Sequence, residues 1–304
     1  MPQLLTEPAY STSAGACYQA DALEILRQLK SNSVALVLTS PPFALRRQKA
    51  YGNVAPSEYV DWFWPFAVEI HRVLRPDGSF VYDLGGAWNR GSGTRSLYPY
   101  ELVLRLTKLF HLAQEIYWFN PSKLPTPAEW VTIRRTRVKD AVNTLWWLSK
   151  TEAPNADNRR VLQPYSRSMR RLLRDGYQTA RRPSQHDISP HFRKDNGGAI
   201  PPNLLQVPNT RSSDSYFRRC REAGLPIHPA RFPQPVPEFF IRFLTEPGQL
   251  VVDPFAGSNM TGFAAEQQGR RWLSIEINAD YVAGSRLRFE DYAVLSGSAD
   301  YAAA

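Results

Sequence analysis

Apolar and polar positions alternate along this chain in a way that predicts strands separated by helices. Apolar runs of strand length, most of them ending in a polar residue, occupy 17–21, 36–39, 79–86, 114–119, 142–148, 249–253 and 272–276. Apolar residues at helical spacing predict helices over 22–30, 59–74, 99–110, 237–244 and through 263–266. Strands that alternate with helices are typical of an open, mainly parallel α/β sheet.

Polar side chains stand where five of these predicted strands end. They are Asp21, Ser40, Asp83, Asp253 and Glu276. Ligands of open α/β sheets bind at the carboxyl ends of the strands, which favours one site built from all five residues. Asp and Ser also favour turns for local reasons, so turn propensity alone is the simpler alternative.

The strand that ends at Ser40 continues into Pro41, Pro42 and Phe43. Two prolines fix φ and carry no N–H, so a stiff rim of carbonyl oxygens is expected next to the serine hydroxyl. Oxygen acceptors beside an aromatic ring suit a planar heterocycle that carries an exocyclic amino group. A strand that ends in an ordinary Pro-Pro turn would give the same four residues.

A second motif follows the predicted strand 249–253 and opens a helix. Its residues are Asp253, Pro254, Phe255, Ala256, Gly257, Ser258 and Thr261. Strand, tight loop and helix form the first half of a mononucleotide-binding βαβ unit, and Glu276 ends the next strand, where it can bind ribose hydroxyls. The loop lacks the full G-x-G-x-x-G pattern and a phosphate-binding lysine. A nucleoside without a phosphate chain, such as S-adenosylmethionine, therefore fits better than a dinucleotide or ATP.

The two motifs together resemble those of the amino-methylating DNA methyltransferases. The chain is most similar to the cytosine-N4 enzymes of bacterial restriction–modification systems, in which Ser-Pro-Pro-Tyr or Ser-Pro-Pro-Phe is the usual catalytic motif. Adenine-N6 relatives mostly carry Asp-Pro-Pro instead. The catalytic motif precedes the cofactor motif, which is the permuted order of the beta group. The resemblance covers residues 9–292 and includes the segments 118–123, 138–143, 196–198 and 228–233.

The resemblance implies a circularly permuted, Rossmann-like methyltransferase fold with an inserted DNA-recognition lobe. The expected parts are an N-terminal arm (1–15), a catalytic half (16–120), a basic recognition region (121–227), a cofactor half (228–292) and a disordered tail (293–304). The implied reaction transfers a methyl group from S-adenosylmethionine to N4 of a cytosine flipped out of double-stranded DNA, with the protein acting as a monomer. Adenine-N6 methylation, RNA as the substrate, and an inactive DNA-binding module are the alternatives.

The same resemblance suggests roles for individual residues. Ser40 and the Pro41 carbonyl would accept from the reacting amine while Phe43 stacks on the base. Asp83 would either relay the proton or only cap the following glycine turn. Asp21 would either meet the adenine amino group or cap the next helix. The segment 228–233, with His228 and Pro229, would close over the methionine part of the cofactor.

Basic residues are concentrated in one region of the chain. The net charge is +9 and the pI about 9.6, which predicts a polyanionic partner. Thirteen basic and only four acidic residues lie between Arg134 and Arg182. We expect this region and the loop that follows Phe43 to bind a phosphate backbone. The alternative is that both are only solvated basic surfaces. The candidate contacts are Arg46, Arg47, Lys49, Arg134, Arg135, Arg170 and Arg171.

Composition excludes several other classes of protein. The two cysteines, Cys17 and Cys220, give neither a disulfide framework nor a metal site, and His228 has no second ligand at metal-binding spacing. Neither a signal sequence nor an apolar run of membrane-spanning length is present, so we expect a cytoplasmic protein without metal.

Overall fold

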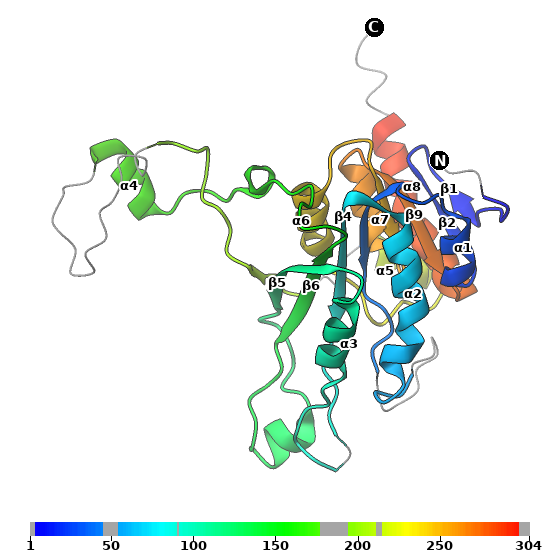
Figure 1. Cartoon of the computed structure of the whole chain (residues 1–304), viewed down its shortest axis with the longest axis horizontal. Coiled ribbons are helices and arrows are strands. Elements are labelled where there is room, and N and C mark those ends of the chain that lie inside the picture. Colours follow the sequence, from blue (N-terminus) through cyan, green and yellow to red (C-terminus); the bar gives the residue numbers. More distant parts are fainter. Residues whose placement is uncertain (1–3, 45–53, 90, 177–193, 211–214, 298–304) are drawn as a thin grey trace, which may run out of the picture. The chain divides into compact units, whose positions relative to one another are not determined.

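The computed structural model describes residues 4–44, 54–89, 91–176, 194–210 and 215–297, with side chains to residue 290 (Figure 1). Two compact units make up the chain. The first contains 1–156 and 203–304, and the second contains 157–202. The predicted phosphate contacts Arg46, Arg47 and Lys49 lie outside the described residues.

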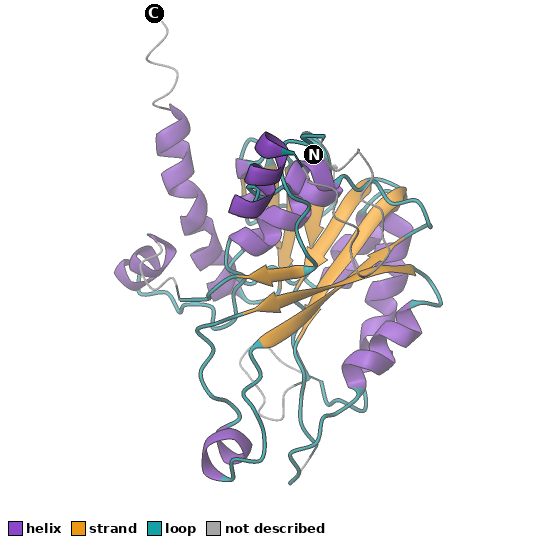
Figure 2. Ribbon diagram, turned by 90° about the vertical axis from the view of Figure 1, so that its left-hand side faces the viewer, coloured by secondary structure: helices purple, strands orange, loops and turns teal. Residues whose placement is uncertain are grey.

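A nine-stranded sheet forms the centre of the first unit (Figure 2). In spatial order its strands are β1 (Tyr10–Ser11), β2 (Gly15–Gln19), β9 (Arg271–Glu276), β8 (Leu250–Asp253), β3 (Val34–Thr39), β4 (Leu74–Leu84), β6 (Val142–Ser149), β5 (His111–Phe119) and β7 (Leu204–Gln206). The five strands from β2 to β4 are parallel to one another, whereas β6 runs antiparallel to both β4 and β5. The predicted α/β sheet is confirmed.

Helices cover both faces of this sheet. One face packs against α1 (Ala22–Gln28), α2 (Tyr59–Val73) and α3 (Tyr98–Leu106). The other packs against α6 (Pro235–Leu244), α7 (Met260–Gln267) and α8 (Ala279–Gly297), with α5 (Ser215–Glu222) contacting α8. At the parallel strands both faces of the sheet are therefore buried, which explains why β3, β8 and β9 are nearly continuous apolar runs.

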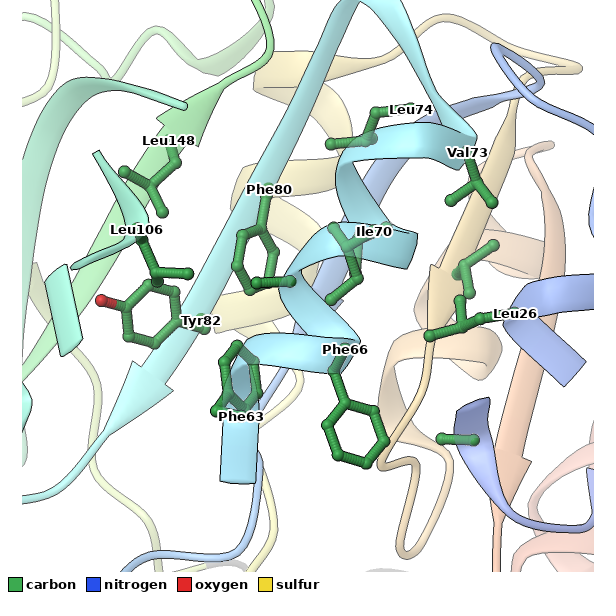
Figure 3. Close-up of a cluster of buried hydrophobic side chains, with 14 of the residues drawn as sticks. Leu26, Phe63, Phe66, Ile70, Val73, Leu74, Phe80, Tyr82, Leu106 and Leu148 are labelled. Atoms are coloured by element: carbon green, nitrogen blue, oxygen red, sulfur yellow. The ribbon is translucent and has the colours of Figure 1, made fainter. Parts of the chain in front are cut away.

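Aromatic packing fixes α2 on the sheet (Figure 3). Phe63 lies nearly parallel to Phe80 of β4, with ring centroids 6.3 Å apart, and Phe66 and Ile70 extend the same cluster. Successive residues of β4 face opposite sides, so Phe80 belongs to this cluster and Val81 to the one on the other face. The strand that leads to Asp83 is thus held from both sides.

The two halves of the chain meet at the middle of the sheet. β3 of the amino-terminal half pairs in parallel with β8 of the carboxyl-terminal half, with Leu36 opposite Val251. The permuted order of the motifs therefore still yields one continuous sheet, because adjacency in the sheet does not depend on order along the chain.

The ends of the chain are more ordered than the sequence suggested. The expected loose arm contains β1, which pairs with β2 through Tyr10 opposite Cys17, and the Tyr10 side chain is buried. A two-residue strand is too short to show a period, so the prediction of an arm through residue 15 was wrong. α8 extends to Gly297, into the predicted tail, and residues 298–304 lie outside the described part.

The region 121–227 is not one lobe. Its strands β6 and β7 belong to the central sheet, and only 157–202 forms a separate unit. That unit contains a 3₁₀ turn (Asn158–Val161) and α4 (Arg167–Asp175), which Ser166 caps. The Asp195 carboxylate accepts from the N–H of Gly197, whose φ of +81° makes the predicted glycine turn. No helix in the described part of the chain is long and apolar enough to cross a membrane.

Candidate active site

The predicted polar strand ends lie at one edge of the sheet. β2, β9, β8, β3 and β4 are parallel neighbours, so their carboxyl ends share that edge. Ser40, Asp83, Asp253 and Glu276 stand at or just after the ends of four of these strands, and Asp21 follows the fifth by two residues. The sheet thus brings together residues separated by up to about 250 positions in sequence.

Asp83 is the centre of a hydrogen-bonded group at the end of β4. The Ser40 hydroxyl donates to its Oδ2 over 3.4 Å, and the Asn143 amide donates to both carboxylate oxygens, at 3.0 and 3.3 Å. Asp83 is only 3% exposed, and burial raises its pKa to about 7 although Asn143, Ser40 and the charge of Lys123 oppose the rise. This carboxyl group therefore gains and loses its proton near neutral pH.

The rim after Ser40 is held by buried tyrosines. The Tyr59 hydroxyl donates to the Pro42 carbonyl over 2.8 Å, and the Tyr98 hydroxyl donates to the Gly85 carbonyl. The Pro42 carbonyl is therefore paired, whereas the sequence suggested that the carbonyls of this rim point outward. The half-buried Phe43 ring lies directly against Gly85, so any side chain at position 85 would displace it. Gly85 thus sets where the Phe43 ring lies.

Asp253 connects the end of β3 to the loop between β8 and α7, which is the predicted cofactor loop. Its Oδ1 accepts from the Thr39 hydroxyl at 2.6 Å and from the Phe255 N–H at 3.1 Å. Burial raises the pKa of Asp253 to about 6, although the hydrogen bonds from Thr39 and Phe255 oppose the rise. Thr39 immediately precedes Ser40, so the position of the cofactor loop and that of the serine are coupled through one hydrogen bond.

Gly257 and Glu276 build the loop between β8 and α7. The Gly257 N–H donates to Glu276 Oε2 over 2.8 Å, and burial raises the pKa of this carboxyl. Gly257 has φ +51°, and a Cβ on it would lie 2.9 Å from the His228 ring. The His228 ring thus occupies the space that a side chain at position 257 would need. This ring lies edge-on to that of Tyr281, with the two ring centroids 4.5 Å apart. The segment that contains Pro229 accordingly lies over this loop.

Residues that the sequence did not single out hold this loop in shape. Asn259 has φ +52° and caps α7 by accepting from the Gly262 N–H, while its amide donates to the Tyr10 hydroxyl over 2.9 Å. Arg288 donates to both the carbonyl and the hydroxyl of Ser258. Asn is one of the few residues that adopt the left-handed backbone conformation readily. This preference was the only feature of the sequence that could have indicated the role of Asn259.

Asp21 and the basic candidates that the structure describes are exposed at the protein surface. The Asp21 carboxylate accepts from the Leu23 N–H at 2.7 Å, so it caps α1, and its side chain is exposed. Arg134 pairs with Glu129 at 2.6 Å, and Arg135 is exposed beside it. Arg170 and Arg171 are exposed on α4, in the second unit. Among the described residues no group of three or more His, Cys, Asp or Glu side chains is placed to hold a metal ion.

Comparison with known proteins identifies the family. The N6/N4 methyltransferase model, described as DNA methylase, matches residues 34–286, so the chain belongs to that family. It is 53% identical over 290 residues to the type II methyltransferase M.PvuII of Proteus hauseri, covering 94% of this chain and 86% of that protein. It is 25% identical over 279 residues to the DNA adenine methyltransferase YhdJ of Escherichia coli K12, covering 90% of this chain and 82% of that protein.

Solved structures agree with this assignment. The PvuII DNA methyltransferase, described as cytosine-N4-specific, superposes with a TM-score of 0.78 at 47% identity and covers 94% of this chain and 90% of that one. A Thermus thermophilus protein, solved with S-adenosyl-L-methionine, shares the fold with a TM-score of 0.56 at 20% identity, covering 91% of this chain and 93% of that one. The methyltransferase fold and the amino-methylating family expected from the sequence are confirmed.

Proposed function

We propose that this protein transfers a methyl group from S-adenosylmethionine to N4 of a cytosine that is flipped out of double-stranded DNA. The observation that carries the proposal is the chain of hydrogen bonds Ser40–Asp83–Asn143 at the edge where the parallel strands end. The 53% identity to M.PvuII supports it, since the solved PvuII enzyme is described as cytosine-N4-specific.

Ser40 and Asp83 can increase the reactivity of an aromatic amine. The lone pair of N4 is delocalised into the ring, so the free amine is a poor nucleophile. The Ser40 hydroxyl points its proton at Asp83, which leaves its oxygen lone pairs to accept from N4–H, with the Pro41 carbonyl as the second acceptor. Both acceptors pull N4 toward tetrahedral geometry and aim its lone pair at the methyl carbon.

The proton lost from the amine passes to Asp83. As the N4–methyl bond forms and the methyl–sulfur bond breaks, N4 becomes positively charged and strongly acidic. Its proton moves to the Ser40 oxygen while the Ser40 proton moves to the ionised Asp83 carboxylate, so the hydroxyl is regenerated. A pKa near 7 suits this role, because the carboxyl is then both ionised before the reaction and able to hold the proton afterwards.

The loop after β8 fits the nucleoside part of the cofactor. When bound, S-adenosylmethionine supplies the electrophilic methyl group. Glu276 stands at the end of β9, and each of its oxygens still has a lone pair for a ribose hydroxyl after accepting from the N–H of Gly257 or Asn278. Asp21 would bind the adenine amino group while capping α1. His228 and Pro229 would cover the methionine part.

The remaining parts of the proposal concern the partner, the assembly and the cellular role of the protein. Double-stranded DNA is the partner that the net charge of +9 suits, and a monomer on the duplex is the simplest assembly. Methylation would protect host DNA in the cytoplasm from a cognate restriction endonuclease. The second candidate is adenine-N6 methylation, because YhdJ is named an adenine methyltransferase and the amine chemistry is the same.

Nucleoside mass spectrometry tests the proposal. Purified protein is incubated with unmethylated duplex DNA and S-adenosylmethionine, with the Ser40→Ala variant as the control. N4-methylcytosine that appears only with the wild type supports the proposal. N6-methyladenine would transfer the chemistry to adenine, and the absence of both products would leave a DNA-binding protein without this activity. Sequencing of the modified sites then identifies the recognition sequence.

A further inference from the structure

Three aliphatic side chains are exposed on one loop. Residues 120–141, here the β5–β6 loop, extend beyond the ends of β5 and β6 (Figure 1). In this loop Leu124 is 72% exposed, Ile133 69% and Val138 86%. Single exposed aliphatic residues are common on protein surfaces, but several on one projecting loop indicate a surface that contacts something else.

The β5–β6 loop is rigidly held although its aliphatic side chains are exposed. Arg137 donates to the Gly93 carbonyl over 2.8 Å and to Asp140 over 3.5 Å, and Arg95 pairs with the same carboxylate at 2.5 Å. Trp130 fits closely over Gly93, where a Cβ would lie 3.2 Å from its ring. The exposed side chains are therefore carried on a loop that keeps its shape, which lowers the entropy lost on binding.

The β5–β6 loop begins and ends beside the proposed reaction site. Asn143, two residues after its end, donates to Asp83. The ammonium group of Lys123, near its beginning, lowers the pKa of Asp83, so that charge lies within electrostatic reach of the carboxyl. The segment with Gly93 and Arg95, which holds the loop, follows the end of β4 by about ten residues. A duplex whose base reaches Ser40 therefore passes close to the residues where this loop begins and ends.

Basic side chains are exposed on the same loop as the aliphatic ones. Lys123, Arg134, Arg135 and Lys139 are all exposed on the loop, where the acidic Glu129 forms an ion pair with Arg134. A loop that exposes both cations and apolar side chains is complementary to a nucleic acid, whose phosphates are anionic and whose base stack is apolar. A second copy of this basic chain would instead meet like charge.

We propose that the β5–β6 loop is the wedge that enters the duplex beside the target base, with Ile133 and Val138 filling the space that the flipped base leaves. The inference rests on the proposed function, because only an enzyme that flips a base needs to fill such a gap. Flipping costs the pairing and stacking of the target base. Apolar side chains inserted between base steps offset this cost in other proteins that distort DNA.

The test compares two duplexes that differ only at the target cytosine. One carries the normal guanine opposite it and the other a mismatch, which makes flipping easier. Single-turnover methylation is measured for the wild type and for the Ile133→Ala and Val138→Ala double variant. We expect the variant to lose roughly tenfold or more of its rate on the paired duplex and to regain most of it on the mismatched one.

Leu104 provides the matched control. It is an aliphatic residue on α3 that is 69% exposed, the same fraction as Ile133. Leu104→Ala should leave the rates on both duplexes unchanged, and thermal melting of all variants should match the wild type because none of the three side chains is buried. Fluorescence of 2-aminopurine at the target position should rise on binding of the wild type and rise less with the double variant.

Three outcomes would overturn the wedge without touching the proposed function. Equal losses on both duplexes would mean that the side chains only contact DNA or support the site. No loss on either would mean that they do not act in flipping. A change in sedimentation mass with unchanged methylation would make the loop an interface between copies. If the wild type itself methylated neither duplex, both the proposed function and the wedge would fail, so the two failures are distinguishable.

Discussion

Replacing Asp83 by Asn should stabilise the protein above neutral pH and at the same time slow methyl transfer. Asp83 is 3% exposed and its pKa is about 7, compared with 3.8 for an unperturbed aspartate. Between these two values the folded state keeps a proton that the unfolded state has released. The free energy of unfolding therefore falls as pH rises through this window, by about 1.4 kcal/mol per pH unit, or roughly 4 kcal/mol in total.

The Asp83→Asn substitution removes this dependence because an amide does not ionise. The amide oxygen can still accept from Asn143, and the NH₂ group can donate to the Ser40 oxygen, so the packing is kept. The variant and the wild type should have similar stability near pH 4. At pH 8 the variant should be more stable by about 2–4 kcal/mol. Denaturant unfolding at both pH values gives the difference, and Asp253, whose pKa is also raised, is common to both proteins.

Methyl transfer should change in the opposite direction. The wild-type single-turnover rate should rise about tenfold per pH unit below pH 7 and level off above it, because only the ionised carboxylate accepts the proton. The Asp83→Asn variant should show a flat profile and a rate lower by about 10²-fold. Parallel stability curves would refute the raised pKa. Normal rates with DNA and cofactor bound would leave Asp83 the structural cap that the sequence offered as the alternative.

Three further changes address other parts of the site. Ser40→Ala should keep cofactor affinity, measured by calorimetry, and lose most activity, because the hydroxyl that accepts from the amine and donates to Asp83 is removed. Near-normal turnover would contradict the role of the hydroxyl. Gly257→Ala should weaken cofactor binding and lower the free energy of unfolding by about 1–3 kcal/mol, since φ at this residue is +51° and the new Cβ would lie 2.9 Å from the His228 ring. Adding His228→Ala should recover only the part of the lost stability that is due to this clash. Reversing the charge of Arg170 and Arg171 should weaken binding to all DNA sequences alike and reduce the slope of log affinity against log salt by about 0.9 for each phosphate that is no longer neutralised; weaker binding to one sequence alone would indicate base readout instead.

Most of the sheet could be predicted because most of its long strands contain an apolar run bounded by turn residues. β3 and β8 are fully buried on both faces, so their sequences show strand character without any tertiary information. β1 and β7, of two and three residues, are too short to show a period. α4 has no buried residue and four arginines, and only Met169, Leu172 and Leu173 are apolar, so its apolar stripe is a single turn long.

The amino-terminal arm shows why long-range polar contacts escape prediction. The buried Tyr10 hydroxyl finds its partners in Asn259 and Ser285, which are about 250 and 275 positions away. Asn259 in turn holds the first turn of α7 below the cofactor loop. The pattern around Tyr10 contains no trace of this network, since each partner is an ordinary polar residue in its own segment.

Asn143 is a site residue that could not be predicted from the carboxyl ends of the strands, because it lies near the beginning of an antiparallel strand. The sequence places it at the start of an apolar strand, where it looks like a core position. β6 runs antiparallel to β4, with Leu84 opposite Thr144, so the beginning of β6 lies where β4 ends. The rule that ligands meet the carboxyl ends of strands applies to the parallel strands alone. An antiparallel neighbour brings its first residues to the same edge, which is why the Asn143 amide reaches both oxygens of Asp83. In a sheet of this kind, the first residues of an antiparallel strand therefore belong among the candidate site residues together with the last residues of the parallel ones.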